Sequence, residues 1–277
     1  MGDRVWVIAV LGQSPGVLTA LVWALCREGL NIVGIEVWTT SGGVVNLEGD
    51  LRRPDDPWLA LESAVRPMRF PRPPQPGTLE EHGPPAGAAL TRAVRQRSCF
   101  ATHVLRGASG ERLIRSLGDA EVLQEALYDR VETLTAQLPP DVQLIGSVAG
   151  GRKTMAAGLQ AAFTMYAEPT ARLVHVLVHP DIERPWTRLR AFRFPGDGSQ
   201  QAWLADNDGP PAPPLGQQLQ LTEIPFAPLR AWRCHFDQVA APSWSTVRAL
   251  PGGLWPGSWT ADIRRGSGGV DPHRTRR

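Results

Sequence analysis

The chain has 277 residues, of which 42% are hydrophobic, and its 29 Lys and Arg residues against 27 Asp and Glu residues leave a net charge of +2. This length and apolar content suffice for a full hydrophobic core, and so mild a charge excludes a protein that binds polyanions through its overall charge. The three cysteines are widely spaced, which argues against a disulfide framework or a structural metal site. With no secretory leader and no membrane-length apolar run, a soluble cytoplasmic protein is expected.

The first 65 residues predict alternating strands and helices. Residues 4–11 form a continuous apolar run of strand length, and apolar residues at three- and four-residue steps over 17–25 predict a helix that Gly29 ends. A second apolar strand follows at 31–40, and a short helical pattern covers 57–65. Strands that are apolar on both faces are typical of a sheet covered by helices on both sides.

The same pattern resumes after a proline-rich insertion at about residues 67–98, which is expected to be a surface loop. A strand is predicted at 100–107, and the longest amphipathic helix is predicted at 118–138 with Asp119 as its N-cap. The remaining elements expected are a strand at 142–149, a helix at 155–167 and a strand at 172–179.

This alternation of strands and helices predicts the fold class and the domain organisation. It indicates an α/β fold with a doubly wound, mostly parallel sheet of the Rossmann type over residues 1–195. Residues 196–277 are rich in proline and tryptophan and lack this pattern, so they are predicted to form a C-terminal extension with a disordered end.

Two turns join a strand to a helix where ligand sites form in such sheets. They are GQSPG at residues 12–16 and AGGRKT at residues 149–154. In open parallel sheets, ligands bind beyond the carboxyl ends of the strands, where the strand order reverses. If the strands at 4–11 and 142–149 are neighbours, both turns open onto one crevice, and two helix N-termini would attract an anion there.

Three common motifs resemble these turns, and each is excluded by one residue that does not fit it. GQSPG matches the nucleophile elbow of α/β-hydrolases, but Pro15 has no N–H to donate to an oxyanion. The second turn lacks the P-loop spacing because Arg152 stands where lysine is required. A dinucleotide fingerprint needs glycine at position 14, which is serine.

The polar and basic residues of the two turns remain open to more than one interpretation. Ser14 followed by Pro15 also matches a helix N-cap with proline at the first helical position, so capping stays open as an alternative role. Arg152 and Lys153 stand at a helix N-terminus, where the helix dipole repels cations unless an anion lies between them. They therefore indicate a phosphate site.

At these residues the chain resembles the CRISPR-associated Rossmann-fold (CARF) proteins, and among them the small stand-alone ring nucleases. The resemblance rests on GQSPGVLTALVWAL, on TTSGG after the second strand, on GSVAGGRKTMAAGLQAAF and on RLVHVLVHPDIE. It implies a homodimer whose joined crevices bind a cyclic oligoadenylate, the second messenger of type III CRISPR antiviral defence. The ring would be cut and the signal ended. Two-fold symmetry admits rings of four or six nucleotides, and we expect cyclic tetra-adenylate.

The resemblance also implies roles for individual residues. Ser14 would orient the ribose 2′-hydroxyl or a phosphate oxygen, and Lys153 would stabilise the pentacoordinate phosphate and protonate the leaving oxygen. Attack by the 2′-hydroxyl on its own phosphodiester needs geometry and charge neutralisation, so no metal or other cofactor is expected. Without a strong general base the turnover should be slow. The other residues expected to bind the ligand are Gly12, Gln13, Thr39, Thr40, Gly150, Gly151, Arg152 and Thr154.

Two alternatives stay open at this point. Thr39 and Thr40 also fit a plain turn after the second strand. The protein as a whole also fits a non-catalytic sensor that binds the cyclic oligoadenylate and signals to a partner. Neither a membrane nor duplex nucleic acid is expected as a partner of this protein.

Overall fold

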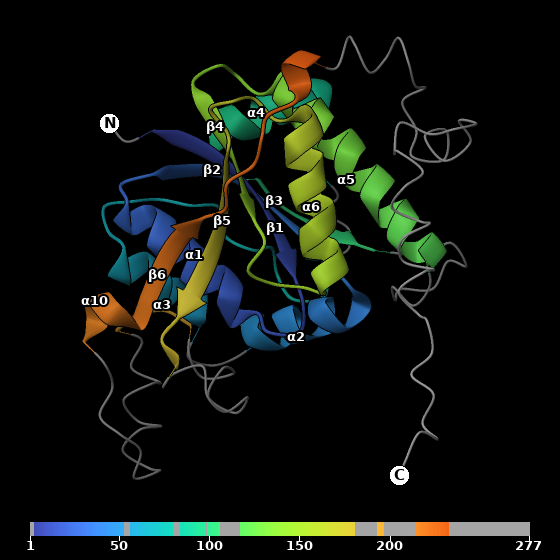
Figure 1. The fold of residues 1–277 in the computed structure, drawn as a ribbon. Helices are drawn as coiled ribbons and strands as arrows, with labels where there is room; N and C mark the ends of the chain where they lie inside the picture. Colours follow the sequence, from blue (N-terminus) through green and yellow to red (C-terminus); the bar gives the residue numbers. More distant parts are fainter. Residues whose placement is uncertain are drawn as a thin grey trace, which may run out of the picture. The chain divides into compact units, whose positions relative to one another are not determined.

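A computed structural model describes residues 3–52, 56–79, 84–97, 99–105, 117–180, 193–196 and 214–232 (Figure 1). Within these residues, six strands form one sheet in the order β3-β2-β1-β4-β5-β6. The first five strands are parallel, and β6 pairs with β5 in the antiparallel sense. The strands are β1 (Arg4–Leu11), β2 (Asn31–Thr39), β3 (Cys99–Val104), β4 (Val142–Ser147), β5 (Arg172–Val178) and β6 (Leu219–Glu223). The predicted doubly wound, mostly parallel α/β fold is confirmed.

Helices cover both faces of the sheet, with α5 and α6 on one side and α1 and α3 on the other (Figure 1). Alternate residues of β1 enter the two cores, Val5 and Val7 on the α1 side and Trp6 and Ile8 on the α6 side. All four side chains are fully buried, which explains why this strand is apolar throughout. The helices are α1 (Gly16–Arg27), α2 (Ser41–Leu51), α3 (Pro57–Ala64), α4 (Gly87–Gln96), α5 (Leu117–Gln137), α6 (Lys153–Tyr166) and α10 (Leu215–Gln218), with a short 3-10 helix at Arg230–Trp232.

Several elements differ from the sequence predictions. The region at 67–98 contains helix α4, whose Leu90 and Val94 enter the core, so it is not a loop throughout. Helix α5 begins at Leu117, which places Asp119 inside the helix and not at its N-cap. Strand β6 extends the sheet beyond the predicted boundary at residue 195, because it pairs along most of β5.

A buried ion pair ties the proline-rich region to the sheet. Glu36 of β2 is 0% exposed and accepts hydrogen bonds from Arg130 Nε at 2.8 Å and from Trp6 Nε1 at 2.9 Å. Arg130 also donates to the carbonyl of Pro85 at 2.8 Å. Because both charges are buried and hydrogen-bonded, removing either partner would leave an uncompensated charge in the core.

No helix in the described part of the chain is both long enough and apolar enough to cross a membrane.

Candidate functional site

The strand order reverses between β1 and β4, which are neighbours at the centre of the sheet. After β1 the chain turns into α1 on one face, and after β4 it turns into α6 on the other face (Figure 1). The carboxyl ends of two such strands form the position where doubly wound folds bind ligands. The two turns singled out in the sequence therefore lie at the topological switch point.

The two turns are in direct main-chain contact. A Cβ atom added to Gly12 would lie 3.1 Å from the nitrogen and 3.2 Å from the Cα of Gly151. On Gly150, a Cβ would lie 2.5 Å from the carbonyl oxygen of Val10 and 3.1 Å from the Cα of Leu11. Gly151 has φ of +79°, a conformation that favours glycine. Residues far apart in the sequence thus meet through glycines that leave no room for side chains.

A third strand-to-helix junction, between β2 and α2, joins the same cluster. Gly43 of α2 packs against the β1–α1 turn, since a Cβ there would lie 2.7 Å from the Gly12 carbonyl oxygen. Asn46 Nδ2 donates a hydrogen bond of 2.7 Å to the carbonyl of Gln13. The sequence predicted neither α2 nor this role for Asn46, because two glycines in the first turn hide the helical pattern and no local signal marks a contact across 33 residues.

All three helices begin near this point. The N-cap residues Pro15 of α1 and Thr40 of α2 make no side-chain capping hydrogen bond, and the first turns of α1, α2 and α6 contain no acidic residue. The Arg152 N–H donates to the weak acceptor Met155 Sδ at 3.4 Å. Three helix N-termini, each the positive end of a helix dipole, give this edge of the sheet a positive polarity that favours an anion.

Ser14 does not cap α1, so that interpretation is wrong. The helix begins at Gly16 with Pro15 as its N-cap, one residue later than the motif predicts. Ser14 contributes its carbonyl, which accepts the Val17 N–H at 3.2 Å. Across the described residues its half-buried hydroxyl makes no hydrogen bond.

The remaining predicted residues divide into exposed and buried groups. Arg152, Lys153 and Thr154 are exposed at the start of α6. Lys153 is the only lysine of the sequence, which has 28 arginines. Thr40 is 9% exposed, whereas Thr39 is 0% exposed, so Thr39 lies behind the surface and its hydroxyl approaches the Thr40 carbonyl at 3.5 Å.

Next to this cluster, His103 at the end of β3 stacks on Trp38 of β2 with ring centroids 3.8 Å apart. Burial, and after it the Arg130 guanidinium, lowers the pKa of His103 from 6.5 to about 4. The folded chain therefore holds His103 neutral where the unfolded chain protonates it. This contribution to stability is complete above pH 6.5 and is lost as the pH falls toward 4.

We expect the His103→Phe variant, which can keep the ring stack, to lose this part of the pH dependence. Relative to the variant, the wild type should lose up to about 3 kcal/mol of unfolding free energy between pH 7 and pH 4. Urea unfolding at several pH values measures the difference. Parallel pH profiles for the two proteins would contradict the assignment.

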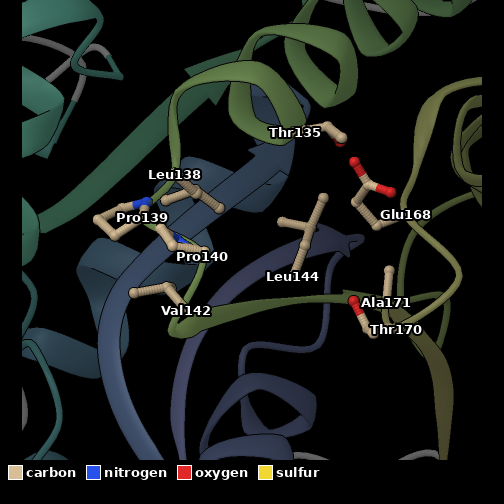
Figure 2. A pocket seen from close by; sticks show the side chains of 9 residues that line it. All are labelled: Thr135, Leu138, Pro139, Pro140, Val142, Leu144, Glu168, Thr170 and Ala171. Carbon is tan, nitrogen blue, oxygen red and sulfur yellow. The ribbon is translucent and has the colours of Figure 1, made fainter.

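A separate pocket of about 290 Å³ lies at the opposite end of β4 (Figure 2). The hydroxyl of Thr135 and the carboxylate of Glu168 face one another across it, and Glu168 pairs with Arg230. Its other lining residues are Leu138, Pro139, Pro140, Val142, Leu144, Thr170 and Ala171. None of the predicted site residues lines this pocket.

Comparison with known proteins finds several similar solved structures and one matching family model. Among the structures is Enterococcus italicus Csm6 bound to cyclic hexa-2′-fluoro-hexa-dAMP, with a TM-score of 0.41 and 8% sequence identity over 86% of this chain. The match covers 46% of that protein, so this chain spans less than half of its length. No curated protein matches the chain. The model of the CRISPR-associated protein NE0113 family matches residues 94–243, more than half of the sequence, and the chain therefore belongs to this family.

Proposed function

We propose that the protein is a ring nuclease that binds a cyclic oligoadenylate at the switch point and cleaves it without a metal ion. The observation that carries the proposal is the main-chain contact between Gly12 and Gly151, which brings Ser14 and Lys153 to neighbouring helix N-termini. Membership of a CRISPR-associated family supports a nucleotide second messenger as the anion.

The chemistry that the residues support is an internal transfer at phosphorus. The ribose 2′-hydroxyl attacks the adjacent phosphodiester, the P–O5′ bond breaks, and a linear product with a 2′,3′-cyclic phosphate remains. The 2′-oxygen loses its proton to solvent water, and a proton is delivered to the 5′-oxygen of the leaving group. Free N–H groups of the helix N-termini and the charge of Lys153 would stabilise the additional negative charge on the phosphoryl oxygens.

The choice of lysine at position 153 fits this chemistry. Arginine binds phosphate in a bidentate manner but does not give up its proton in proteins, whereas lysine provides a compact charge and three donors and can transfer a proton. In a sequence with 28 arginines, the only lysine stands at the first residue of α6. We assign it the proton of the leaving 5′-oxygen, and we assign Ser14 the orientation of the 2′-hydroxyl.

Binding would use two copies of the chain. A ring of four or six identical nucleotides can have two-fold symmetry, and a symmetric dimer presents the same cluster twice. Each protomer would then contribute Gln13, Thr40, Gly150, Gly151, Arg152 and Thr154 around one half of the ring.

The decisive experiment incubates purified protein with radiolabelled cyclic tetra-adenylate or cyclic hexa-adenylate in EDTA. Linear products that end in a 2′,3′-cyclic phosphate support the proposal. Rings that bind but stay intact would favour a non-catalytic sensor, and rings that do not bind would remove the cyclic oligoadenylate from consideration. The Ser14→Ala variant tests the role of the hydroxyl. We expect it to slow cleavage without a loss of stability, because the hydroxyl does not cap α1.

A further inference from the structure

The turn that contains Ser14 is held against α2 through two consecutive carbonyl groups. The carbonyl oxygen of Gly12 lies 2.7 Å from the position that a Cβ on Gly43 would occupy. The carbonyl of the next residue, Gln13, accepts the hydrogen bond from Asn46 Nδ2 at 2.7 Å. In an extended chain successive carbonyls point in opposite directions, so this turn is folded such that both face α2.

The direction of these carbonyls fixes the direction of two N–H groups. A trans peptide is planar, and its N–H points opposite to its carbonyl. The N–H groups of Gln13 and Ser14 therefore both project away from α2. Neither N–H has a hydrogen-bond partner in the part of the chain that the structure describes. Pro15, which has no N–H, ends the run.

Two successive N–H groups on one side of a turn form a concavity that binds anionic oxygens. In this protein it lies in the turn that contacts Gly151. A phosphate oxygen bound there would be within reach of the Ser14 hydroxyl, because that side chain belongs to the same residue as one of the donors. The orientation of the Gln13–Ser14 peptide then decides whether the donor faces the phosphate.

From these contacts we infer that Asn46 is a positioning residue for ring cleavage, an inference that rests on the proposed function. Its side-chain amide holds the Gln13–Ser14 peptide in the orientation that directs the Ser14 N–H toward the phosphate. The contact lies at the surface, where a hydrogen bond to a solvated carbonyl adds little to folding. Asparagine is also a weaker helix former than alanine, so α2 gains nothing in helix propensity from asparagine at this position.

The test compares Asn46→Ala, Asn46→Asp and Asn46→Gln with the wild type. Alanine removes the donor, and aspartate replaces it by a carboxylate that repels the Gln13 carbonyl. We expect kcat on cyclic tetra-adenylate to fall about tenfold for alanine and further for aspartate, with KM changed less, because the lost donor acts mainly in the transition state. Glutamine keeps an amide donor and should recover part of the rate. Val45→Ala is the matched control, since Val45 directly precedes Asn46 in α2 and is 66% exposed.

A second measurement tests the effect of Asn46 on the Gln13–Ser14 peptide without relying on ring cleavage. The ¹⁵N shift of the Ser14 amide reports the orientation of this peptide without any ligand, and it should move in the alanine and aspartate variants but not in Val45→Ala. Unchanged kcat together with an unchanged Ser14 amide would overturn the inference while the ring nuclease stands. If the wild type binds the ring but leaves it intact, the catalytic proposal and the role of Asn46 in cleavage both fail, whatever the Ser14 amide shift shows. If the wild type does not bind the ring at all, both fail.

Discussion

Replacing Lys153 with methionine should lower the rate of ring cleavage by about a hundredfold or more and leave the fold intact. The loss follows from removing both a charge next to the phosphoryl oxygens and the proton donor for the leaving oxygen, each of which typically contributes at least this much. Stability should not fall, because Lys153 makes no ion pair among the described residues and a cation at a helix N-terminus is unfavourable by about 0.3–1 kcal/mol. Single-turnover cleavage of cyclic tetra-adenylate and thermal unfolding measure the two effects.

Two comparisons make this prediction specific. Lys153→Arg keeps the charge but not the transferable proton, so a full loss of rate assigns proton transfer and a retained rate assigns charge alone. Arg95→Met removes an exposed cation from the last turn of α4 and should change neither quantity. Because the sequence has one lysine, reductive ¹³C-methylation places one label on a side-chain amine, and its resonance should shift when the ring binds. An unaltered cleavage rate in Lys153→Met would remove this residue from the mechanism.

The Gly150→Ala variant should lose cleavage and about 1–3 kcal/mol of unfolding free energy. The new Cβ would lie 2.5 Å from the Val10 carbonyl oxygen and 3.1 Å from the Leu11 Cα. Both atoms belong to the main chain of the central strand, so the strain cannot be relieved by a change of rotamer, and overpacking of this kind costs about 1–3 kcal/mol. The β4–α6 turn would have to move away from β1, which would separate Gly151 from Gly12.

The matched control for this variant is Gly49→Ala in α2. Gly49 has no atom within 4 Å of its Cβ position, and alanine is favoured over glycine inside a helix by about 0.5–1 kcal/mol. We expect this variant to be as stable as the wild type or more stable, with normal cleavage. Equal stability of the two alanine variants in urea unfolding would contradict the packing argument.

The sequence predicts the central sheet well because burial on both faces leaves a clear record there. Strands β1 and β4 and helix α1 are visible as apolar runs or periodic patterns whose ends are marked by glycine or proline. Helices α2 and α4 are harder to recognise in the sequence. Helix α2 begins with Ser-Gly-Gly and α4 follows a proline-rich stretch, so tertiary contacts outweigh local propensity in both.

The candidate site, too, has features that the sequence predicts and features that it does not. The turns at Gly12 and Gly151 are recognisable because only glycine permits such close contact, and the fold rule for parallel sheets predicts that they meet. The shifted start of α1, the burial of Thr39 and the contact of Asn46 with Gln13 depend on packing between segments that are distant in the sequence. No pattern within a single segment specifies them.

The proposed anion site between the β1–α1 and β4–α6 turns is walled largely by main chain, since glycines form the contacts between the two turns. Peptide dipoles act over the length of a hydrogen bond, well within the distance of about 8 Å over which dissolved ions screen charges at physiological ionic strength. Arg152 and Lys153 supply the part of the attraction that added salt weakens. Most of the affinity for a bound cyclic oligoadenylate would therefore persist when the ionic strength changes. The lifetime of the signal would then depend on the rate of bond cleavage more than on the salt concentration.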